Sequence, residues 1–322
     1  MSLYDIVLGI IFFSQTGVGV LGNSLLFCFY VFTLFSSHRS RLLDPILVQL
    51  TLTNTIVLLS KGCPLVNFYF GDVYFLGNLG CQMVFYFQRM SRGLAACTTC
   101  LLSIFQAVTI SPSSSRLAKH KVRVLKLIRP SCLLCWIFNM IIEVNVPFHI
   151  TGSKRINSSH TGGFEVLYCY WEKVLKEVTI LPSLRDILCV GGMVWASGYI
   201  IVLLYRHQRK VQHIHRTSLS QKTSPEIRAT QTILLLLSIF VSAYCISCGF
   251  TLYKVYVTHS GDWLVVVSTF TALCFPTISP FLLIHRDSQI FSSCCASWQK
   301  SILNSWNSCG DFQVDSSLDQ IS

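Results

Sequence analysis

The chain alternates between long apolar stretches and short polar segments. Seven of the apolar stretches are close to, or longer than, the roughly 20 residues that a helix needs to cross the core of a bilayer. They cover residues 6–34, 45–66, 79–110, 131–150, 183–205, 229–253 and 263–284. The pattern predicts an all-α membrane protein, with a seven-transmembrane helix bundle over residues 1–285 and a tail over residues 286–322.

The composition supports a membrane protein. Hydrophobic residues make up 52% of the chain and charged residues only 12%, and the mean hydropathy is +0.56. A soluble globular protein carries about 25% charged residues. The net charge of +11 would suit nucleic-acid binding, but the basic residues fall in loops between apolar stretches, which membrane orientation explains better. We therefore expect the lipid bilayer as a partner and no nucleic acid.

The distribution of lysine and arginine predicts the orientation of the helices. Sixteen of these residues lie in the loops after the first, third and fifth stretches and in the tail, whereas five lie in the remaining loops. Cytoplasmic loops carry the excess of basic residues in membrane proteins. The N-terminus is therefore expected outside the cell and the C-terminus in the cytoplasm. The first stretch is too long for a signal peptide and lacks a basic segment before it, so we expect it to remain as the first helix.

The loop over residues 151–180 is predicted to lie outside. It holds a glycosylation sequon at Asn157 and a cysteine, Cys169, while Cys81 begins the third stretch. Both cysteines would face an oxidising compartment, which favours a disulfide between them over two free thiols. In the tail, apolar residues at helical spacing over residues 290–306 predict a short amphipathic helix on the inner leaflet, where Cys294 and Cys295 are candidates for palmitoylation.

Two arginines interrupt the third stretch. Arg89 and Arg92 share one helix face, and a charge near the bilayer centre costs several kcal/mol unless it finds a partner or a water-filled cavity. At 1.5 Å per residue, Arg92 lies about 5 Å outward of the membrane centre and Arg89 about 9 Å. Lys61 and Glu143 come out in the same outer half. Arg185 and Asp186, at the outer end of the fifth stretch, are interpreted as interfacial.

This clustering has two interpretations. One is an outward-open pocket whose excess positive charge suits an anionic ligand. The other is a structural ion pair, such as Glu143 with Arg92, although one carboxylate cannot neutralise three cations. Lys61 has the further option of extending to the outer interface. Aromatic residues at the same level, among them Phe85 and Tyr86, would line the pocket or form an interface belt.

The sequence carries no sign of catalysis. It has no Ser-His-Asp arrangement, no Walker loop and no metal-ligand cluster. The C-x-x-C pairs at Cys97/Cys100, Cys132/Cys135 and Cys245/Cys248 lie within apolar stretches and are interpreted as packing residues. We expect no cofactor and no enzymatic activity.

Four blocks of sequence resemble the vomeronasal type-1 receptors, a family of seven-helix G-protein-coupled receptors for pheromone-like cues. They are LTNTIVLLSKGCP (52–64), RGLAACTTCLLSIFQAVTISP (92–112), SPEIRATQTILLLLSIFV (224–241) and FPTISPFLLI (275–284). With Gly22-Asn23 in the first helix, the resemblance spans nearly the whole chain. Rhodopsin-like receptors usually have Asp-Arg-Tyr where this chain has Phe105-Gln106-Ala107, and an acidic residue where it has Asn54. The vomeronasal family shares these departures, which put a charged switch and a sodium site in doubt.

The resemblance implies a plasma-membrane receptor that binds a small, pheromone-like molecule and activates an inhibitory-type G protein. A sulfated steroid would suit Arg89, Arg92 and Lys61. The residues expected to face the G protein are Gln106, Arg116, Arg123, Arg209 and Arg228. The basic loops have the alternative of setting topology and binding anionic lipid. The rival functions are a bitter-taste-like receptor and a membrane anion transporter or channel.

Overall fold

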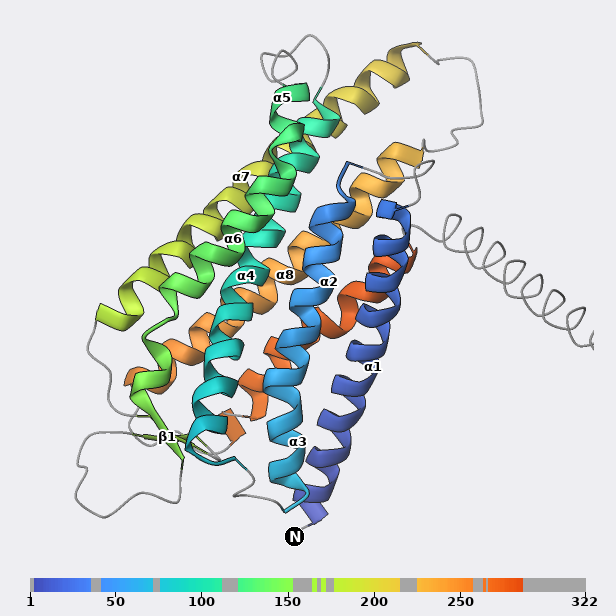
Figure 1. Ribbon diagram of the computed structural model, residues 1–322. Coiled ribbons are helices and arrows are strands. Elements are labelled where there is room, and N and C mark those ends of the chain that lie inside the picture. Colours follow the sequence, from blue (N-terminus) through green and yellow to red (C-terminus); the bar gives the residue numbers. More distant parts are fainter. Residues whose placement is uncertain are drawn as a thin grey trace, which may run out of the picture. The chain divides into compact units, whose positions relative to one another are not determined.

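A computed structural model gives the architecture of the chain (Figure 1) and describes residues 3–35, 42–71, 76–111, 121–152, 164–166, 169–171, 177–214, 225–256, 263–264 and 266–285. The helices are α1 (Leu3–Phe35), α2 (Asp44–Val57), α3 (Cys63–Tyr69), α4 (Asn78–Ile110), α5 (Lys121–Lys126), α6 (Ile128–Ile142), α7 (Glu177–Ile214), α8 (Pro225–Tyr256) and a last helix, Val266–His285. The contacts described below belong to one compact unit, Met1–Pro280. The amphipathic helix expected in the tail, with Cys294 and Cys295, lies outside the described residues.

Each of the seven apolar stretches contains a helix, so the predicted all-α architecture is confirmed, although α6 ends at Ile142 within the stretch 131–150. Among the described residues, six helices are long and apolar enough to cross a membrane: Leu3–Phe35, Asp44–Tyr69, Asn78–Ile110, Ile128–His149, Ile180–Arg206 and Val266–His285. The apolar part of α8, Leu234–Phe250, is shorter than these spans. The seventh span and the orientation of the termini stay predictions.

The second spanning helix contains a wider turn. A π-helical turn, η1 (Leu58–Gly62), joins α2 to α3 directly before Pro64. Proline has no N–H to donate, and its ring clashes with the carbonyl four residues earlier in a regular α-helix. A turn with one extra residue relieves that clash without ending the helix. Lys61 lies in this turn and is partly buried.

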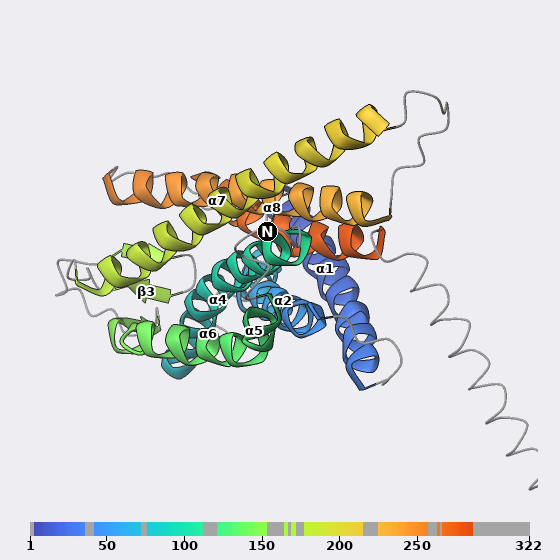
Figure 2. The same cartoon turned by 90° about the horizontal axis from the view of Figure 1, so that it is seen from above.

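Helix α4 is surrounded by other helices. It packs against α2, α6, α7 and α8, and the two views show it between α2 and α6 (Figures 1 and 2). Gln49 on α2 donates a hydrogen bond of 2.8 Å to Thr98 Oγ1 on α4. The C-terminal half of α4 is almost fully buried, which its small residues, such as Ala95 and Ala96, permit.

A buried polar cluster joins the first two spans to the last helix. Asn54 Nδ2 donates to Ser279 Oγ at 2.9 Å and to Asn23 Oδ1 at 3.2 Å. Asn23 Nδ2 donates in turn to the carbonyl of Pro276 at 2.8 Å. Gly22 allows this approach, because a Cβ there would lie 2.9 Å from the Pro280 ring. Such hydrogen bonds stabilise helix contacts inside a membrane, where water offers no alternative partner.

A three-stranded antiparallel sheet lies at the start of α4. Its strands are β1 (Ile150–Gly152), β2 (Phe164–Val166) and β3 (Cys169–Trp171), in the order β1-β3-β2. The predicted disulfide between Cys81 and Cys169 is present and ties β3 to α4. The backbone N–H of Gly152 donates to Asn78 Oδ1 at 3.0 Å and holds β1 to the same helix end. The sequon at Asn157 lies outside the described residues.

The outward faces of the helices are strongly apolar. On α6, Leu133 and Leu134 are exposed by 66% and 64%, and large apolar side chains on α1 and α7 are exposed in the same way. A soluble monomer rarely exposes contiguous apolar patches of this kind. Lipid tails cover such faces at no cost, which agrees with the six spanning helices.

Candidate functional site

Charged and polar side chains from four helices meet around α4. Helix α4 contributes Arg89 and Arg92, and α6 contributes Asn139 and Glu143. Helices α7 and α8 contribute Arg185, Asp186, Tyr244 and Cys248. We call these eight residues the charged cluster.

Glu143 pairs with two arginines. Its side chain is 1% exposed, and it follows the last residue of α6. Its Oε2 accepts a hydrogen bond of 2.9 Å from Arg89 Nε, and its Oε1 accepts one of 3.1 Å from Arg185 Nη1. A buried carboxylate is stable only when it is paired and hydrogen-bonded. Glu143 therefore holds α4, α6 and α7 together.

The interpretation of Arg185 as interfacial is wrong. Only 3% of its side chain is exposed, and its Nη2 lies 3.0 Å from Asp186 Oδ1. Its Nη1 also donates to Asn139 Oδ1 at 2.9 Å. Gly93 makes room for this guanidinium, since a Cβ on Gly93 would overlap both Arg185 and Asn139. Asp186 balances the charge of Arg185, so this pair leaves the excess of cations counted from the sequence unchanged.

Arg92 has a different environment from Arg89. The ion pair of Glu143 with Arg92, suggested by the sequence, is not formed, because Glu143 bonds Arg89 and Arg185 instead. The Arg92 guanidinium lies over the Tyr244 ring, 4.9 Å from its centroid, and Nη2 donates to Cys248 Sγ at 3.2 Å. Among the described residues, Arg92 forms no ion pair with a carboxylate.

The Tyr244 hydroxyl forms no hydrogen bond of normal geometry in the described part of the chain, although the residue is only 8% exposed and both Arg92 and Asp186 lie near it. A buried hydroxyl without a partner costs about 1–3 kcal/mol. The cluster therefore presents a cation and an unused hydrogen-bond donor side by side. An anionic or acceptor group placed there would satisfy both.

The other proposed ligand residues have contacts of their own. Phe85 is buried in an apolar cluster with the Cys81–Cys169 disulfide, Val146 and Ile150, next to the three-stranded sheet. Tyr86 donates a long hydrogen bond of 3.4 Å to the Met140 carbonyl. Lys61 lies in η1 on the second span, which contributes no residue to the charged cluster.

Of the residues expected to face a G protein, Gln106 lies near the C-terminal end of α4 and Arg123 lies on α5. Gln106 is buried, and its Oε1 has no partner among the described residues. Arg123 is exposed on α5, and the Arg209 guanidinium lies 5.0 Å from the centroid of the Tyr205 ring on α7. Arg116 is outside the described residues, and the side chain of Arg228 on α8 is not described.

The C-x-x-C cysteines of α4 pack against α7. Cys97 Sγ lies 3.6 Å from Cys189 Sγ, both residues are buried, and Asn139 Nδ2 donates to Cys97 Sγ. Within the described ranges, no group of three or more His, Cys, Asp or Glu residues has the geometry of a metal site. Cys97 and Cys189 therefore fill the interface between two helices.

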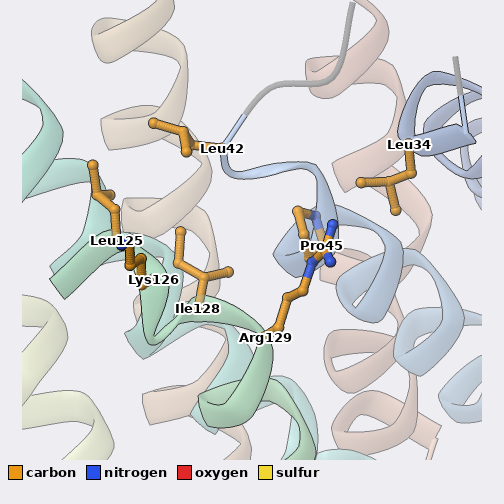
Figure 3. Close-up of a pocket in the computed structure, with 7 residues that line it drawn as sticks. All are labelled: Leu34, Leu42, Pro45, Leu125, Lys126, Ile128 and Arg129. Atoms are coloured by element: carbon orange, nitrogen blue, oxygen red, sulfur yellow. The ribbon is translucent and has the colours of Figure 1, made fainter. Parts of the chain in front are cut away.

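Two pockets can be described in the part of the chain that the structure covers, and neither is lined by a residue of the charged cluster. One, of about 410 Å³, is lined by Ile246, Gly249, Phe250, Trp263 and Leu264, all without charge. The other, of about 320 Å³, lies where α1, α2, α5 and α6 meet and contains Lys126 and Arg129 (Figure 3). The outer ligand pocket predicted from the sequence stays a prediction.

Sequence reasoning missed three members of the cluster, Asn139, Tyr244 and Cys248, as well as the inward position of Arg185 and the adjacent Gly93. One signal was available for Arg185, since an Arg-Asp pair inside an apolar stretch is costly in lipid and marks a partner within the bundle. Gly93 carried no signal beyond its position next to Arg92. Its role depends on α7, which lies ninety residues away in sequence.

Comparisons with known proteins agree with this architecture. The sequence profile described as the vomeronasal organ pheromone receptor family matches residues 6–296. Vomeronasal type-1 receptor 4 of Homo sapiens is 40% identical over 291 residues, which cover 89% of this chain and 96% of that protein. Vomeronasal type-1 receptor 90 of Rattus norvegicus is 37% identical over 285 residues, or 87% and 91% of the two chains. The chain therefore belongs to the vomeronasal organ pheromone receptor family and is a multi-pass receptor of the plasma membrane, not an enzyme.

Proposed function

We propose that this chain is a chemosensory receptor with seven membrane-spanning helices that binds a small anionic molecule in the outer half of the bundle and activates an inhibitory-type G protein. A sulfated steroid is the ligand class that suits the site, because it combines one fixed negative charge with an apolar body. The observation that carries the proposal is the pairing of Arg92, which forms no ion pair with a carboxylate in the described chain, with the unsatisfied Tyr244 hydroxyl.

The two arginines of α4 have different roles in the charged cluster. Arg89 is bonded to Glu143, which also holds Arg185, so Arg89 stabilises the bundle. Among the described residues, Arg92 contacts the Tyr244 ring and the Cys248 sulfur, both weak partners for a cation, and it interacts with Asp186 without forming an ion pair. A sulfate would gain two charge-assisted hydrogen bonds from the Arg92 fork and a third from Tyr244. Arg92 is therefore our ligand-binding residue, and Lys61 remains a candidate for a second contact.

The orientation follows from the same reasoning as the sequence analysis. The start of α1 and strand β1 lie at one end of the helices, and α5 lies at the other (Figure 1). The basic residues of α5 favour the cytoplasm, which leaves the disulfide-bonded sheet and the N-terminus outside. Glycosylation of Asn157 in cells would support this orientation, and modification of the α5 loop by an extracellular reagent would contradict it.

Signal transmission requires a ligand that prefers one arrangement of the helices. A sulfate at Arg92 would touch both α4 and α8, because Tyr244 and Cys248 lie on α8. Gln106 is about 21 Å further along α4 at 1.5 Å per residue. A ligand shifts the population of states only by its difference in affinity between them. We propose that the contact between α4 and α8 is the element that the ligand biases.

The test compares a sulfated steroid with its unconjugated form in cells that carry a G-protein reporter. Tyr244→Phe is the sharpest variant, because the hydroxyl that it removes forms no hydrogen bond of normal geometry within the described residues. We expect unchanged surface expression and an EC50 for the sulfated ligand raised about 10-fold or more, the worth of one hydrogen bond to a charged group. Arg92→Gln should abolish the response to that ligand.

The control is the response to the unconjugated steroid, or to any agonist without a charge, which Tyr244→Phe should leave unchanged. Normal expression with an unchanged EC50 for both variants would refute the binding role of this site. Membrane currents that persist without a G protein would favour the anion channel instead.

A further inference from the structure

The pocket between α1, α2, α5 and α6 has two kinds of wall (Figure 3). Leu34, Pro45 and Ile128 form an apolar side, whereas Lys126 and Arg129 supply two cations. The Arg129 side chain extends from α6 toward Pro45 at the start of α2, so it lies across the pocket (Figure 3). The volume, about 320 Å³, suits part of a molecule with a polar and an apolar end.

The two cations have few partners in the protein. Lys126 and Arg129 are exposed, and neither forms an ion pair within the described residues. The nearest acidic residue in sequence, Asp44 before Pro45, is buried and accepts a hydrogen bond from Thr33 Oγ1. An anion in the pocket would therefore meet positive charge.

The position of the pocket restricts the source of that anion. Further along α6, Leu133 and Leu134 are exposed to the surroundings of the bundle, and Leu133 follows Arg129 by one helical turn. In the proposed orientation, α5 and the start of α6 lie at the cytoplasmic interface. That leaflet is rich in anionic phospholipids, which attract basic residues near the surface. A soluble anion without an apolar part would make no favourable contact with the apolar wall.

We propose that this pocket binds one anionic phospholipid of the cytoplasmic leaflet. Its phosphate lies between Lys126 and Arg129, with the guanidinium fork of Arg129 bonded to two phosphate oxygens. The glycerol and the upper acyl chain lie against Leu34, Pro45 and Ile128. The lipid links the end of α1 and the start of α2 to the α5–α6 corner. This inference rests on the proposed orientation for the identity of the leaflet.

The experiment measures lipid retained by the full chain in nanodiscs of phosphatidylcholine with phosphatidylserine, followed by native mass spectrometry after partial delipidation. We expect one phosphatidylserine to be retained in preference to phosphatidylcholine. Arg129→Gln and Lys126→Gln should each lower its retention about fivefold, the effect of one basic residue near an anionic headgroup. Arg123→Gln is the matched control. Arg123 is exposed on α5, the helix that carries Lys126, but it does not line the pocket.

A second variant tests the apolar wall. Leu34→Trp keeps every charge and fills part of the pocket, so it should also lower retention, with monodispersity in detergent as the check on folding. An equal loss for Arg123→Gln and Arg129→Gln would show diffuse surface attraction and overturn the proposal. Displacement by inorganic phosphate at millimolar concentration would identify a simple anion site and overturn it too.

The result is independent of ligand binding and of orientation in cells. Both leaflets of a nanodisc have the same composition, so retention reports the pocket itself. A failed orientation would appear separately, as an unglycosylated Asn157 with normal lipid retention. A failed lipid site would appear as lost retention with a normal Asn157.

Discussion

Glu143→Gln is the change with the largest expected effect on stability. It keeps the shape of the side chain and removes the charge that faces Arg89 and Arg185. The two bonds are 2.9 and 3.1 Å long, and the Glu143 side chain is 1% exposed. Removing one member of a buried ion pair typically costs 3–5 kcal/mol, because the remaining charge is left without compensation.

The surroundings of Arg185 and Arg89 indicate where in that range the loss of unfolding free energy falls. Arg185 keeps Asp186 and Asn139, and Arg89 is 25% exposed and partly solvated. Glutamine also still accepts one hydrogen bond through its oxygen. We therefore expect a loss near the lower limit, about 3 kcal/mol. In a protein of this size such a loss lowers Tm by roughly 6–12 °C.

The assay is thermal unfolding of the purified protein in detergent, with Arg89→Gln as the comparison. Arg89→Gln leaves Glu143 paired with Arg185 and removes a partly exposed cation, so its Tm should fall by less than half as much. Arg185→Gln should resemble Glu143→Gln, and the double variant should lose less than the sum of the two. Equal Tm values for the wild type and Glu143→Gln would refute the structural role of this ion pair.

Three further predictions concern other parts of the bundle. Gly93→Val should reduce surface expression severely, because its side chain would overlap the Arg185 guanidinium, whereas Gly198→Val, with open space at the Cβ, should express normally. Cys169→Ser should release the sheet from α4 and lower Tm, and the same protein under reducing conditions should show no further loss. Asn54→Ala should cost about 1 kcal/mol, since it breaks two hydrogen bonds of the kind that average about 0.6 kcal/mol in membranes; an unchanged Tm would contradict the role of the cluster around Asn54.

Much of the fold was predictable from local properties of the sequence. A helix in lipid satisfies its own backbone hydrogen bonds, so length and apolar composition alone locate it. The stretch over residues 79–110 corresponds to α4 at Asn78–Ile110, and 6–34 to α1 at Leu3–Phe35. The stretch over residues 131–150 was less accurate, because α6 ends at Ile142 and a 3₁₀ turn, Val146–His149, follows with Pro147 in it. The disulfide was also predictable, since Cys81 and Cys169 face the same compartment.

The partners of the buried charges depended on the tertiary structure. The sequence by itself determined that Arg89 and Arg92 share a face of one helix and that Glu143 lies at a similar depth. It did not determine that Arg185 turns inward, because that depends on α7 packing against the gap at Gly93. Because Arg185 and Arg89 both form ion pairs with Glu143, Arg92 lies beside Tyr244 on α8 without an ion pair to a carboxylate among the described residues. Helix positions follow from the transfer of each segment into lipid, whereas charge pairing follows from which helices touch, and only the packed bundle decides that.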